Sequence, residues 1–387
     1  MIALVVTIIV LLILAAVAIN LTIGDNGIFT RAQDATEKWQ QAEVNEQHEM
    51  NGVVNFIDDY TKNQGPKKVA DVVGGDKFDK TETIQDDNGK EVTIPKDFGV
   101  AEDSNTVVDD GIVITDGTNE FVWVPVDDPS TMFEEKTATL TGVTTQTSIY
   151  SKLRVRSSDS SSYSPGAPGT SGIREPDVLS NNDTDPQYYQ DVLGFESTKA
   201  MADSMVAEYK AMSESIKKYH GFWIGRYELT GTTEKPTVKS GDVLTAAEAG
   251  KWYGLYKACQ NVIRNNTDVK STMIYGCQWD ETMSWLKNTE FKGREDKVDT
   301  DSSSWGNYGS GSPINTGSVS TYKANEIFDL AGNYYDWTQE ASSTNNRVYR
   351  GGYYDNSGSS RPAAGRAYSN AGSSSSGVSS RAVLYIL

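Results

Sequence analysis

The sequence predicts an α+β protein in which a long, two-part N-terminal helix precedes a head of short strands, helices and irregular loops. Three observations lead to this fold class. The first 24 residues carry no charge, residues 25–65 repeat apolar side chains at helical spacing, and strand-like segments alternate with helical segments after residue 66. With 20 Tyr, 10 Phe and 8 Trp in 387 residues, the head can build a hydrophobic core of its own.

The first segment, residues 1–24, reads "MIALVVTIIVLLILAAVAINLTIG" and has no charge before Asp25. About 23 residues at ~1.5 Å each give roughly 35 Å of helix, which crosses a bilayer core of ~30 Å. A cleaved signal peptide is the alternative, because Ala16-Val17-Ala18 resembles a cleavage site, but no basic leader precedes the apolar run. We expect a retained helix whose partner is the membrane.

Residues 25–65 predict an amphipathic stalk helix after the break at Gly24-Asp25-Asn26-Gly27. Apolar side chains recur there in steps of three and four, as on one face of a helix, until Gly65-Pro66 ends the pattern. The members of this stripe are Ile28, Ala32, Ala35, Trp39, Ala42, Met50, Val53, Ile57 and Tyr60.

An apolar helix continued by an amphipathic one resembles the type IV pilins and pseudopilins, and "IALVVTIIVLLILAAVAI" is similar to the pilin N-terminal helix. The resemblance implies packing against other pilin subunits in a filament, at the envelope of a Gram-positive bacterium. Two departures stand against it: the family's basic leader is missing, and Ala3 stands where most pilins carry Glu. We expect the natural start codon to lie upstream; simple membrane anchoring is the alternative.

The net charge and the two cysteines restrict which partners and which covalent links the chain can have. The chain carries 53 acidic and 35 basic residues, a net charge of −18, which argues against a nucleic-acid partner. Its two cysteines, Cys259 and Cys277, could form an extracellular disulfide, but their spacing matches no known signature. Cys259 also falls on the apolar face of a predicted helix, where a small core residue is the other interpretation.

The rest of the chain predicts a small β connecting region over 66–111 and a larger domain over 112–387, with an insertion at 134–219. Strands are expected at 91–95, 111–116, 121–126 and 221–231, and helical spacing returns over 201–219. A further helix starts at Thr245, where Thr-Ala-Ala-Glu is a capping box. A short one is expected over 280–288 with Asp280 as its N-cap. Residues 137–186, rich in Ser, Thr, Pro, Gly and Asp, predict a surface insertion or a partly disordered segment.

Five segments then occur in one order: "FVWVPV", "FWIGRYELT", "YGCQWDETMSWL", "FDLAGNYYDWT" and "RVYRGG". Together they resemble the formylglycine-generating-enzyme, or sulfatase-modifying-factor, family, whose domain has a C-type-lectin-like fold. The same residues make physical sense alone: Gly332-Asn333 allows a left-handed turn, and Gly351-Gly352 allows close passage of the backbone beneath aromatic rings. Large tryptophans anchor the scaffold. The expected scaffold residues are Trp123, Trp223, Trp337, Gly351 and Gly352.

The resemblance also raises the questions of metal and catalysis. It implies a structural calcium ion at Asn333 and Asp336, whose oxygens suit calcium; turn capping without metal is the alternative. The family's oxidases need a cysteine pair after the Arg-Gly-Gly segment, and residues 353–387 contain no cysteine. Iron-dependent relatives need several His ligands, whereas this chain has only His48 and His220. We therefore expect no enzymatic activity and no certain cofactor.

The segment 350–377, "RGGYYDNSGSSRPAAGRAYSNAGSSSSG", is short of core-forming side chains and lies between two strand-like segments. It predicts a surface loop, and its content of Tyr, Ser, Gly and Asn is typical of a binding surface. It resembles the C-terminal cassette of diversity-generating retroelement variable proteins. The expected ligand-binding residues are Tyr353, Tyr354, Asp355, Asn356, Ser360, Arg361, Arg366, Tyr368 and Asn370. A plain surface loop is the alternative, and Arg361 and Arg366 can instead brace the loop through backbone carbonyls.

These observations favour a surface protein at the cell envelope, held by the membrane or in a pilus, whose extracellular head binds a protein or glycan ligand. Adhesion and display, rather than catalysis, are the expected function. Two other classes stay open: an enzyme of the formylglycine-generating or non-heme oxidase kind, and a purely structural pilin subunit.

Overall fold

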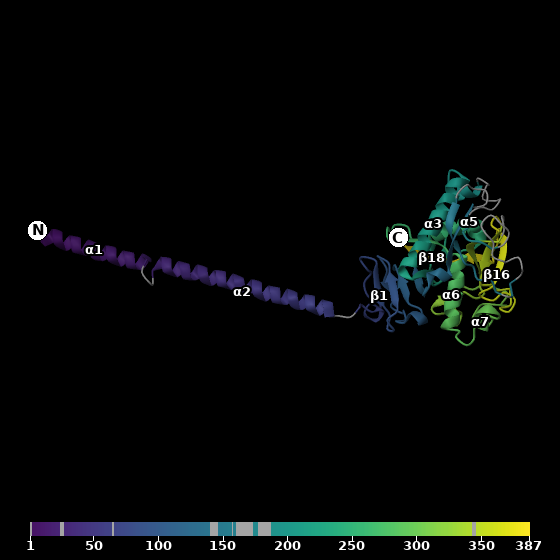
Figure 1. Ribbon diagram of the computed structural model, residues 1–387, viewed down its shortest axis with the longest axis horizontal. Coiled ribbons are helices and arrows are strands. Elements are labelled where there is room, and N and C mark those ends of the chain that lie inside the picture. The colour runs from purple at the N-terminus through teal and green to yellow at the C-terminus, as the bar shows by residue number, and fades with distance from the viewer. Residues whose placement is uncertain are drawn as a thin grey trace. The chain divides into compact units, whose positions relative to one another are not determined.

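The computed structural model describes residues 2–23, 27–63, 66–139, 146–156, 158–159, 173–176, 187–342 and 346–387. Its side chains are described except at 2–5, 20, 48, 55–63, 136–139 and 146–148. The chain divides into two compact units, Met1–Pro66 and Lys67–Leu387 (Figure 1). The second unit is the head.

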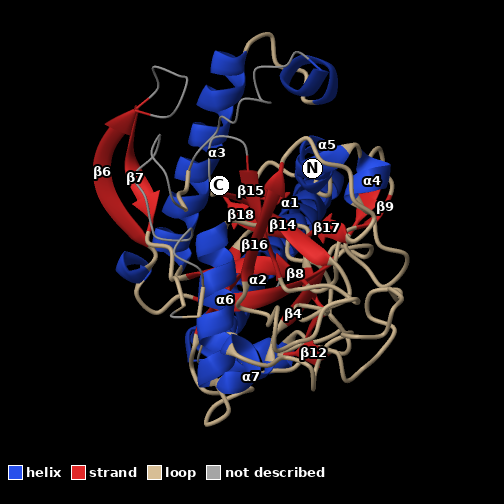
Figure 2. Cartoon of the chain, turned by 90° about the vertical axis from the view of Figure 1, so that its right-hand side faces the viewer, coloured by secondary structure: helices blue, strands red, loops and turns tan. Residues whose placement is uncertain are grey.

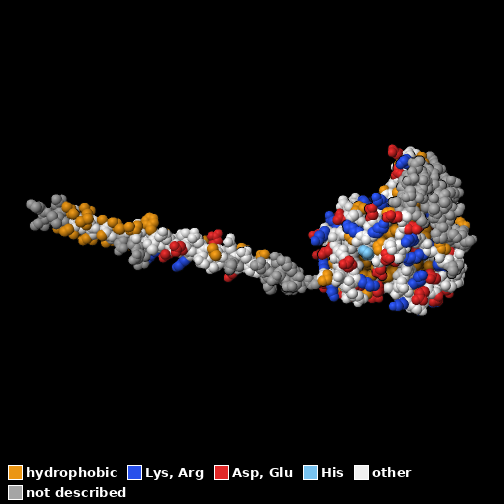
Figure 3. Space-filling model, in the orientation of Figure 1, with side chains coloured by type: hydrophobic (Ala, Val, Ile, Leu, Met, Phe, Trp, Pro, Cys, Tyr) orange, Lys and Arg blue, Asp and Glu red, His pale blue; other side chains and the backbone are white. Residues whose placement is uncertain are grey.

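The first unit consists of two helices, α1 (Ile2–Ile23) and α2 (Ile28–Asn63). The described apolar side chains of α1, such as Leu12 and Leu21, are exposed, and they form the orange segment of Figure 3. Because it has 22 residues and no charge, α1 is long and apolar enough to cross a membrane, and a signal sequence has the same features. The predicted long N-terminal helix is confirmed, with a mixed α and β head after it.

The head is organised around a six-stranded antiparallel sheet in the order β11-β18-β8-β5-β4-β3. The strands are β3 (Gly99–Val100), β4 (Val113–Thr115), β5 (Glu120–Pro125), β8 (Gly221–Gly225), β11 (Val269–Met273) and β18 (Ala382–Ile386). The apolar runs "FVWVP" and "GFWIG" are buried on both faces, which is why they read as continuous rather than alternating patterns. The predicted strand at 221–231 ends early, at Gly225.

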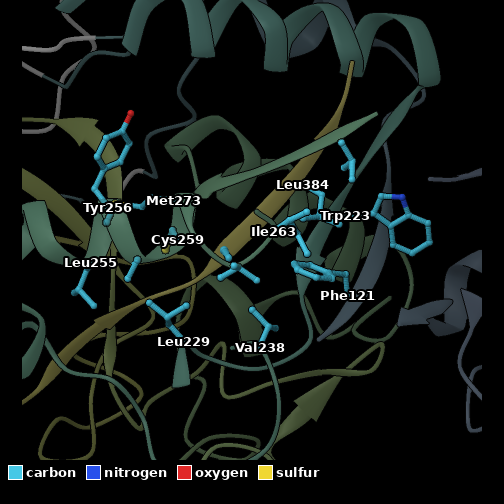
Figure 4. Close-up of a cluster of buried hydrophobic side chains, with 14 of the residues drawn as sticks. Phe121, Trp223, Leu229, Val238, Leu255, Tyr256, Cys259, Ile263, Met273 and Leu384 are labelled. Atoms are coloured by element: carbon cyan, nitrogen blue, oxygen red, sulfur yellow. The ribbon is translucent and has the colours of Figure 1, made fainter. Parts of the chain in front are cut away.

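Alternate residues of this sheet feed two separate hydrophobic clusters. Trp123 and Trp223 point to one cluster, with ring centroids 5.0 Å apart, whereas Val122 and Ile224 point to the other. Figure 4 shows the first cluster, in which Trp223 lies near Phe121 and Leu384. The sheet is therefore the middle layer of the head.

The helices of the head are α3 (Thr198–Tyr219), α4 (Ala246–Ala249), α5 (Lys251–Gln260), α6 (Gly276–Asn288) and α7 (Asp296–Asp299). Of these, α3, α5 and α6 pack against strands of the central sheet. The capping box at Thr245 is confirmed, because Thr245 and Glu248 each bond the other's backbone amide. The prediction of Asp280 as an N-cap is wrong: α6 begins four residues earlier, and Asp280 lies buried within it.

Two of the expected regions pack into the head. The region 66–111 is not separate from the head, because β3 joins the central sheet and Val108 is fully buried. The insertion at 134–219 includes α3, whose Met205, Tyr209 and Ile216 pack in the core. Most of 137–186, predicted to be a surface insertion, lies outside the described residues.

The remaining elements are short. Strand pairs are β1 (Glu82–Gln85) with β2 (Glu91–Ile94), β6 (Phe133–Thr139) with β7 (Gln146–Ser151), β9 (Thr230–Gly231) with β10 (Pro236–Thr237), and β12 (Lys323–Ala324) with β13 (Ile327–Phe328). Single turns of 3-10 helix occur at Val69–Asp71, Val108–Asp110 and Pro129–Thr131, and a π-helical turn at Gln187–Val192.

A second sheet, in the order β16-β15-β14-β17, carries the C-terminal segments (Figure 2). Its strands are β14 (Tyr335–Ala341), β15 (Asn346–Arg350), β16 (Arg366–Asn370) and β17 (Val378–Ser380). β15 pairs antiparallel with both β14 and β16, and β17 runs parallel to β14. The segment between β15 and β17 therefore contains a strand, β16, and is not a continuous loop.

Candidate ligand-binding site

Two tight backbone turns shape the C-terminal face of the head. Gly332 and Asn333 have φ values of 74° and 59°, which is the predicted left-handed turn. Gly351 and Gly352 follow β15 with φ values of 88° and 78°. A Cβ at Gly352 would lie 2.5 Å from the carbonyl oxygen of Arg361 and 2.8 Å from the Tyr308 ring, so this close approach requires glycine.

The expected binding residues fall into three groups. Asp355, Ser360, Arg361 and Tyr368 are exposed, and Tyr353, Tyr354, Asn356 and Asn370 are half-buried. Arg366 is buried, with only 3% of its surface exposed, and it lies on β16 rather than on an open loop. Its guanidinium instead points into the head and donates to the carbonyl oxygen of Arg154 at 2.7 Å.

The half-buried tyrosines support one another. Tyr353 stacks on Tyr335 at 5.2 Å between centroids and meets Tyr354 edge-on at 5.0 Å. The Tyr335 hydroxyl donates to the Asn356 side-chain oxygen at 2.6 Å, which ties the turn after Gly352 to β14. Tyr349 extends the cluster, with its ring 4.3 Å from that of Tyr335. These rings are therefore held in fixed positions.

A groove of about 620 Å³ opens beside this cluster. Tyr349, Arg361 and Tyr368 contribute side chains to it, and Tyr368 is 43% exposed. The other described residues that line it are Arg156, Ser158, Asp159, Asp299, Thr300, Ser359, Ser360, Pro362, Gly365, Arg366 and Ala367. Its size suits a small ligand or a short segment of a larger one.

A buried ion-pair cluster lies behind the groove and is defined by Asp280, Glu340, Arg350 and Arg366. Arg366 approaches Asp280 at 2.6 Å and Glu340 at 2.9 Å, and Arg350 approaches the same carboxylates at 2.8 and 3.5 Å. No side chain of the four is more than 5% exposed. Asp159 also lies 3.7 Å from Arg366 and pairs with Arg156 at 2.6 Å. With these two residues the connected group holds three cations and three anions, so it joins α6, β14, β15 and β16 without a net charge.

The pKa directions in this cluster follow from burial and charge. Burial alone would raise the pKa of Asp280, but Arg366 and Arg350 outweigh it and hold that pKa below its ordinary value. Burial raises the pKa of Glu340, and the same two guanidiniums only partly oppose it. Asp280 therefore keeps its negative charge to a lower pH than Glu340 does.

Asn333 and Asp336, the expected calcium ligands, are engaged with the protein. The Asn333 amide donates to Glu228 at 2.6 Å, and its oxygen accepts from Asn307 at 3.2 Å and from the Ile314 N–H at 3.0 Å. Both acceptor positions of that oxygen are therefore taken. Asp336 lies 3.4 Å from Arg381, and burial raises its pKa to about 6. The Asn333 side chain thus braces the turn, whereas Asp336 Oδ1 has no hydrogen-bond partner among the described residues. Among described residues no cluster of three or more His, Cys, Asp or Glu is placed to hold a metal.

The cysteines and histidines lie apart from the groove. Cys259 and Cys277 are buried and free, so the disulfide that the sequence left open does not form. Burial raises the pKa of both thiols, which makes them unreactive. His220 is exposed at the C-terminal cap of α3, and the side chain of His48 is outside the described residues.

Sequence reasoning missed several residues of the site. Asp280 and Glu340 form the ion-pair cluster, and Arg156 and Asp159 line the groove from a segment that composition assigned to an insertion. Tyr349 had a usable signal: it alternates with Val348 and Arg350 on a strand, facing the same side as Trp337. The other four residues had no such signal in the sequence, because the residues they contact are distant along the chain.

Comparisons with known proteins add little to this geometry. No protein-family model matches the chain, and no curated protein matches it. Among solved structures, "Crystal Structure of CarF" is 12% identical with a TM-score of 0.30, over 43% of this chain and 87% of that one. "Treponema denticola variable protein 1" is 15% identical with a TM-score of 0.26, over 70% of this chain and 97% of that one. Neither likeness carries an argument about what this chain does.

Proposed function

We propose that this protein binds an extracellular protein or glycan through the groove of Tyr349, Arg361 and Tyr368, while α1 holds it at the cell envelope. One observation carries the proposal: a solvent-open groove whose exposed side chains stand on a fixed base. Tyr349 is held by the aromatic cluster, and the strand bearing Tyr368 is fixed by the buried ion pairs. Preorganised contacts of this kind lower the entropy cost of binding.

The proposal places the head outside the cell, in a Gram-positive bacterium, on a membrane anchor or in a pilus with other subunits. The length and uncharged sequence of α1 support anchoring. The order of the five C-terminal segments supports a C-type-lectin-like, sulfatase-modifying-factor-like head. Binding without catalysis is supported by the two buried thiols and by a sequence with only two histidines.

Diversification of the rim by a retroelement is part of the same proposal. Asp355, Ser360, Arg361 and Tyr368 are exposed, so their replacement leaves the core intact. Buried Arg366 does not belong to such a set, because its loss would unbalance the ion-pair cluster. A near-identical template repeat and a reverse transcriptase gene beside this gene are expected. An intact genomic neighbourhood without them would contradict this part of the proposal.

The binding test uses the full chain in detergent micelles on arrays of glycans and of host or phage surface proteins. Wild type should capture at least one ligand, and Tyr368→Ala and Arg361→Ala should each weaken capture about tenfold or more. Lys235→Ala, an exposed cation outside the groove lining, is the matched control and should bind as wild type does. Equal capture by all variants, or no capture by wild type, would contradict the proposed function.

A further inference from the structure

The groove adjoins a second cavity. This second cavity has a volume of about 440 Å³, and α6 lines it with Met283, Ser284 and Lys287. The groove, of about 620 Å³, is lined from β16 by Ala367 and Tyr368 (Figure 2). Each volume lies within the range of about 300–1,000 Å³ that holds a small ligand. The two share four lining residues, so they form one two-part cleft from β16 to α6; these are Arg156, Ser158, Asp299 and Thr300.

The cations in the middle and at the α6 end of the cleft already have carboxylate partners. Arg156 pairs with Asp159 at 2.6 Å, and Lys287 pairs with Asp299 at 3.0 Å. At the β16 end, Arg361 adds one exposed positive charge. The cleft therefore offers a ligand hydrogen-bonding groups rather than a large net charge, which favours a neutral ligand over a charged one.

The middle of the cleft is polar. Ser158 and Thr300 are exposed, and within the described part of the chain neither hydroxyl bonds another residue. The Asp299 side chain is 34% exposed, and its carboxylate can accept more hydrogen bonds than Lys287 supplies. The core of a protein–protein interface is apolar and poor in charged residues, so this middle does not suit a protein segment. A ligand with many hydroxyls, each both donor and acceptor, matches it.

Tyrosine rings line the β16 end of the cleft. Tyr368 is 43% exposed, and half-buried Tyr349 is held with its ring 4.3 Å from that of Tyr335. The face of an aromatic ring carries partial negative charge and attracts polarised C–H groups. A sugar ring presents such C–H groups on one face and hydroxyls around its edge. Tyrosine rings beside free hydroxyls therefore suit a sugar.

We propose that the two-part cleft binds a neutral oligosaccharide chain that runs from the tyrosines to α6. One sugar packs on Tyr368 and Tyr349, and the chain passes Asp299 and Thr300 to reach the α6 cavity at Ser284. Affinity then depends on chain length, because a short chain fills only one of the two cavities. This inference rests on the proposed function and names its ligand class as glycan rather than protein.

The probes are neutral oligosaccharides of glucose, galactose, mannose or N-acetylglucosamine, from disaccharides to hexasaccharides. The full chain is used in micelles of a detergent without a sugar headgroup, and isothermal titration calorimetry measures binding. In at least one series, affinity should rise about tenfold or more from disaccharide to pentasaccharide and then level off. It should change less than about twofold between about 0.05 and about 0.5 M salt, because the ligand is neutral.

Substitutions at the two ends of the cleft separate the cavities. Ser284→Trp fills the α6 cavity, so it should remove the gain with length and leave disaccharide binding within about threefold of wild type. Ser204→Trp, at an exposed serine of α3 outside both linings, is the matched control and should keep the gain. Tyr368→Ala should weaken all lengths about tenfold, whereas Tyr368→Phe keeps the ring and should bind as wild type does.

Near-ultraviolet circular dichroism checks that each variant is folded. Thr300→Trp, at an exposed position between the two cavities, tests the same passage if Ser284→Trp does not fold, and it should also remove the gain with length. The length series on wild type needs no variant at all.

The remaining outcomes contradict the inference. Equal affinity for all lengths, tighter binding of acidic than of neutral oligosaccharides, or the same loss in Ser284→Trp and Ser204→Trp would each overturn it. Capture of a surface protein by wild type without binding of any oligosaccharide would preserve the proposed function and overturn this inference alone. Absence of any captured ligand would overturn both.

Discussion

Arg366 Nη2 lies 2.6 Å from Asp280 Oδ2, and the two side chains are 0% and 5% exposed. This pair joins β16 to α6 across 86 residues of sequence. Glu340 of β14 contacts the same guanidinium, so three elements share one buried cation. The groove wall at β16 is therefore fixed by buried charges.

Arg366→Ala should destabilise the head by about 3–5 kcal/mol, because it leaves Asp280 and Glu340 buried beside a single cation, Arg350. Urea unfolding followed by near-ultraviolet circular dichroism measures this change. Arg361→Ala removes the same kind of side chain from an exposed position and should cost less than about 0.5 kcal/mol. Equal losses in the two variants would show that the cluster does not hold the head together.

Glu175 should make the head less stable as pH rises from about 4.5 to about 7. Burial, then the nearby charge of Glu340, raises its pKa from 4.5 to about 7. Its folded form holds a proton that the unfolded chain has released, so stability falls between about pH 4.5 and 7 and the loss is complete above that range. The free energy of unfolding lost over this range is about 3 kcal/mol.

Glu175→Gln cannot release a proton, so the free energy of unfolding of this variant should fall less than that of wild type between pH 4.5 and 7.5. The Gln oxygen can still accept from Ser151 and Cys277, which share one Glu175 oxygen. The Gly276 N–H, which bonds the other oxygen, loses its acceptor, so the variant should be less stable at every pH and only the slope of stability with pH is compared. The comparison uses chemical unfolding at four pH values in this range. Parallel pH profiles for the two proteins would assign the pH dependence to other buried carboxylates.

Gly352→Ala should destabilise the head by more than about 2 kcal/mol, since its Cβ would clash with the Arg361 carbonyl at a positive φ. Gly309→Ala is the matched control, because Gly309 has a φ of 60° and open space around its Cβ. This control measures only the cost of placing an alanine at a positive φ, which is expected to be near 1 kcal/mol. Thermal unfolding of both variants gives the difference in stability. If the two variants unfold at the same temperature, the close approach at Gly352 does not add to the cost of the substitution.

Cys259 and Cys277 should stay unlabelled by iodoacetamide in the folded protein and react fully after unfolding in urea. Both thiols are buried, and burial raises the pKa of each, so neither accessible thiolate nor disulfide is expected. Mass spectrometry of the intact chain counts the labels. Two fewer hydrogens than the reduced mass in non-reduced protein would reveal a disulfide and contradict the structure.

The parts that sequence predicted depend on local spacing. The long N-terminal helix, the Thr245 capping box and the left-handed turn at Gly332-Asn333 involve residues within a few positions of each other. Patterns at that range report directly on backbone geometry. The tryptophans at 123, 223 and 337 are fully buried, which their strand context indicated.

The parts that it did not predict depend on contacts between distant residues. Arg366 stands among serines and glycines, a composition that indicates a loop, yet its partners are Asp280 and Glu340. Asp280 precedes an apolar helical pattern, which suggested a cap, although the helix begins at Gly276. Composition gives the solvent preference of a segment, but it does not say which polar residue meets an opposite charge in the fold.

The place of β18 constrains when the head can fold. Residues 382–386 lie between β11 and β8 in the central sheet, so β11 joins the other four strands only through this strand. A nascent chain that has not yet released these residues from the ribosome lacks an inner strand of its main sheet. The head must therefore complete folding after nearly all of it has been synthesised, and a premature stop before codon 382 should yield a chain unable to close its core.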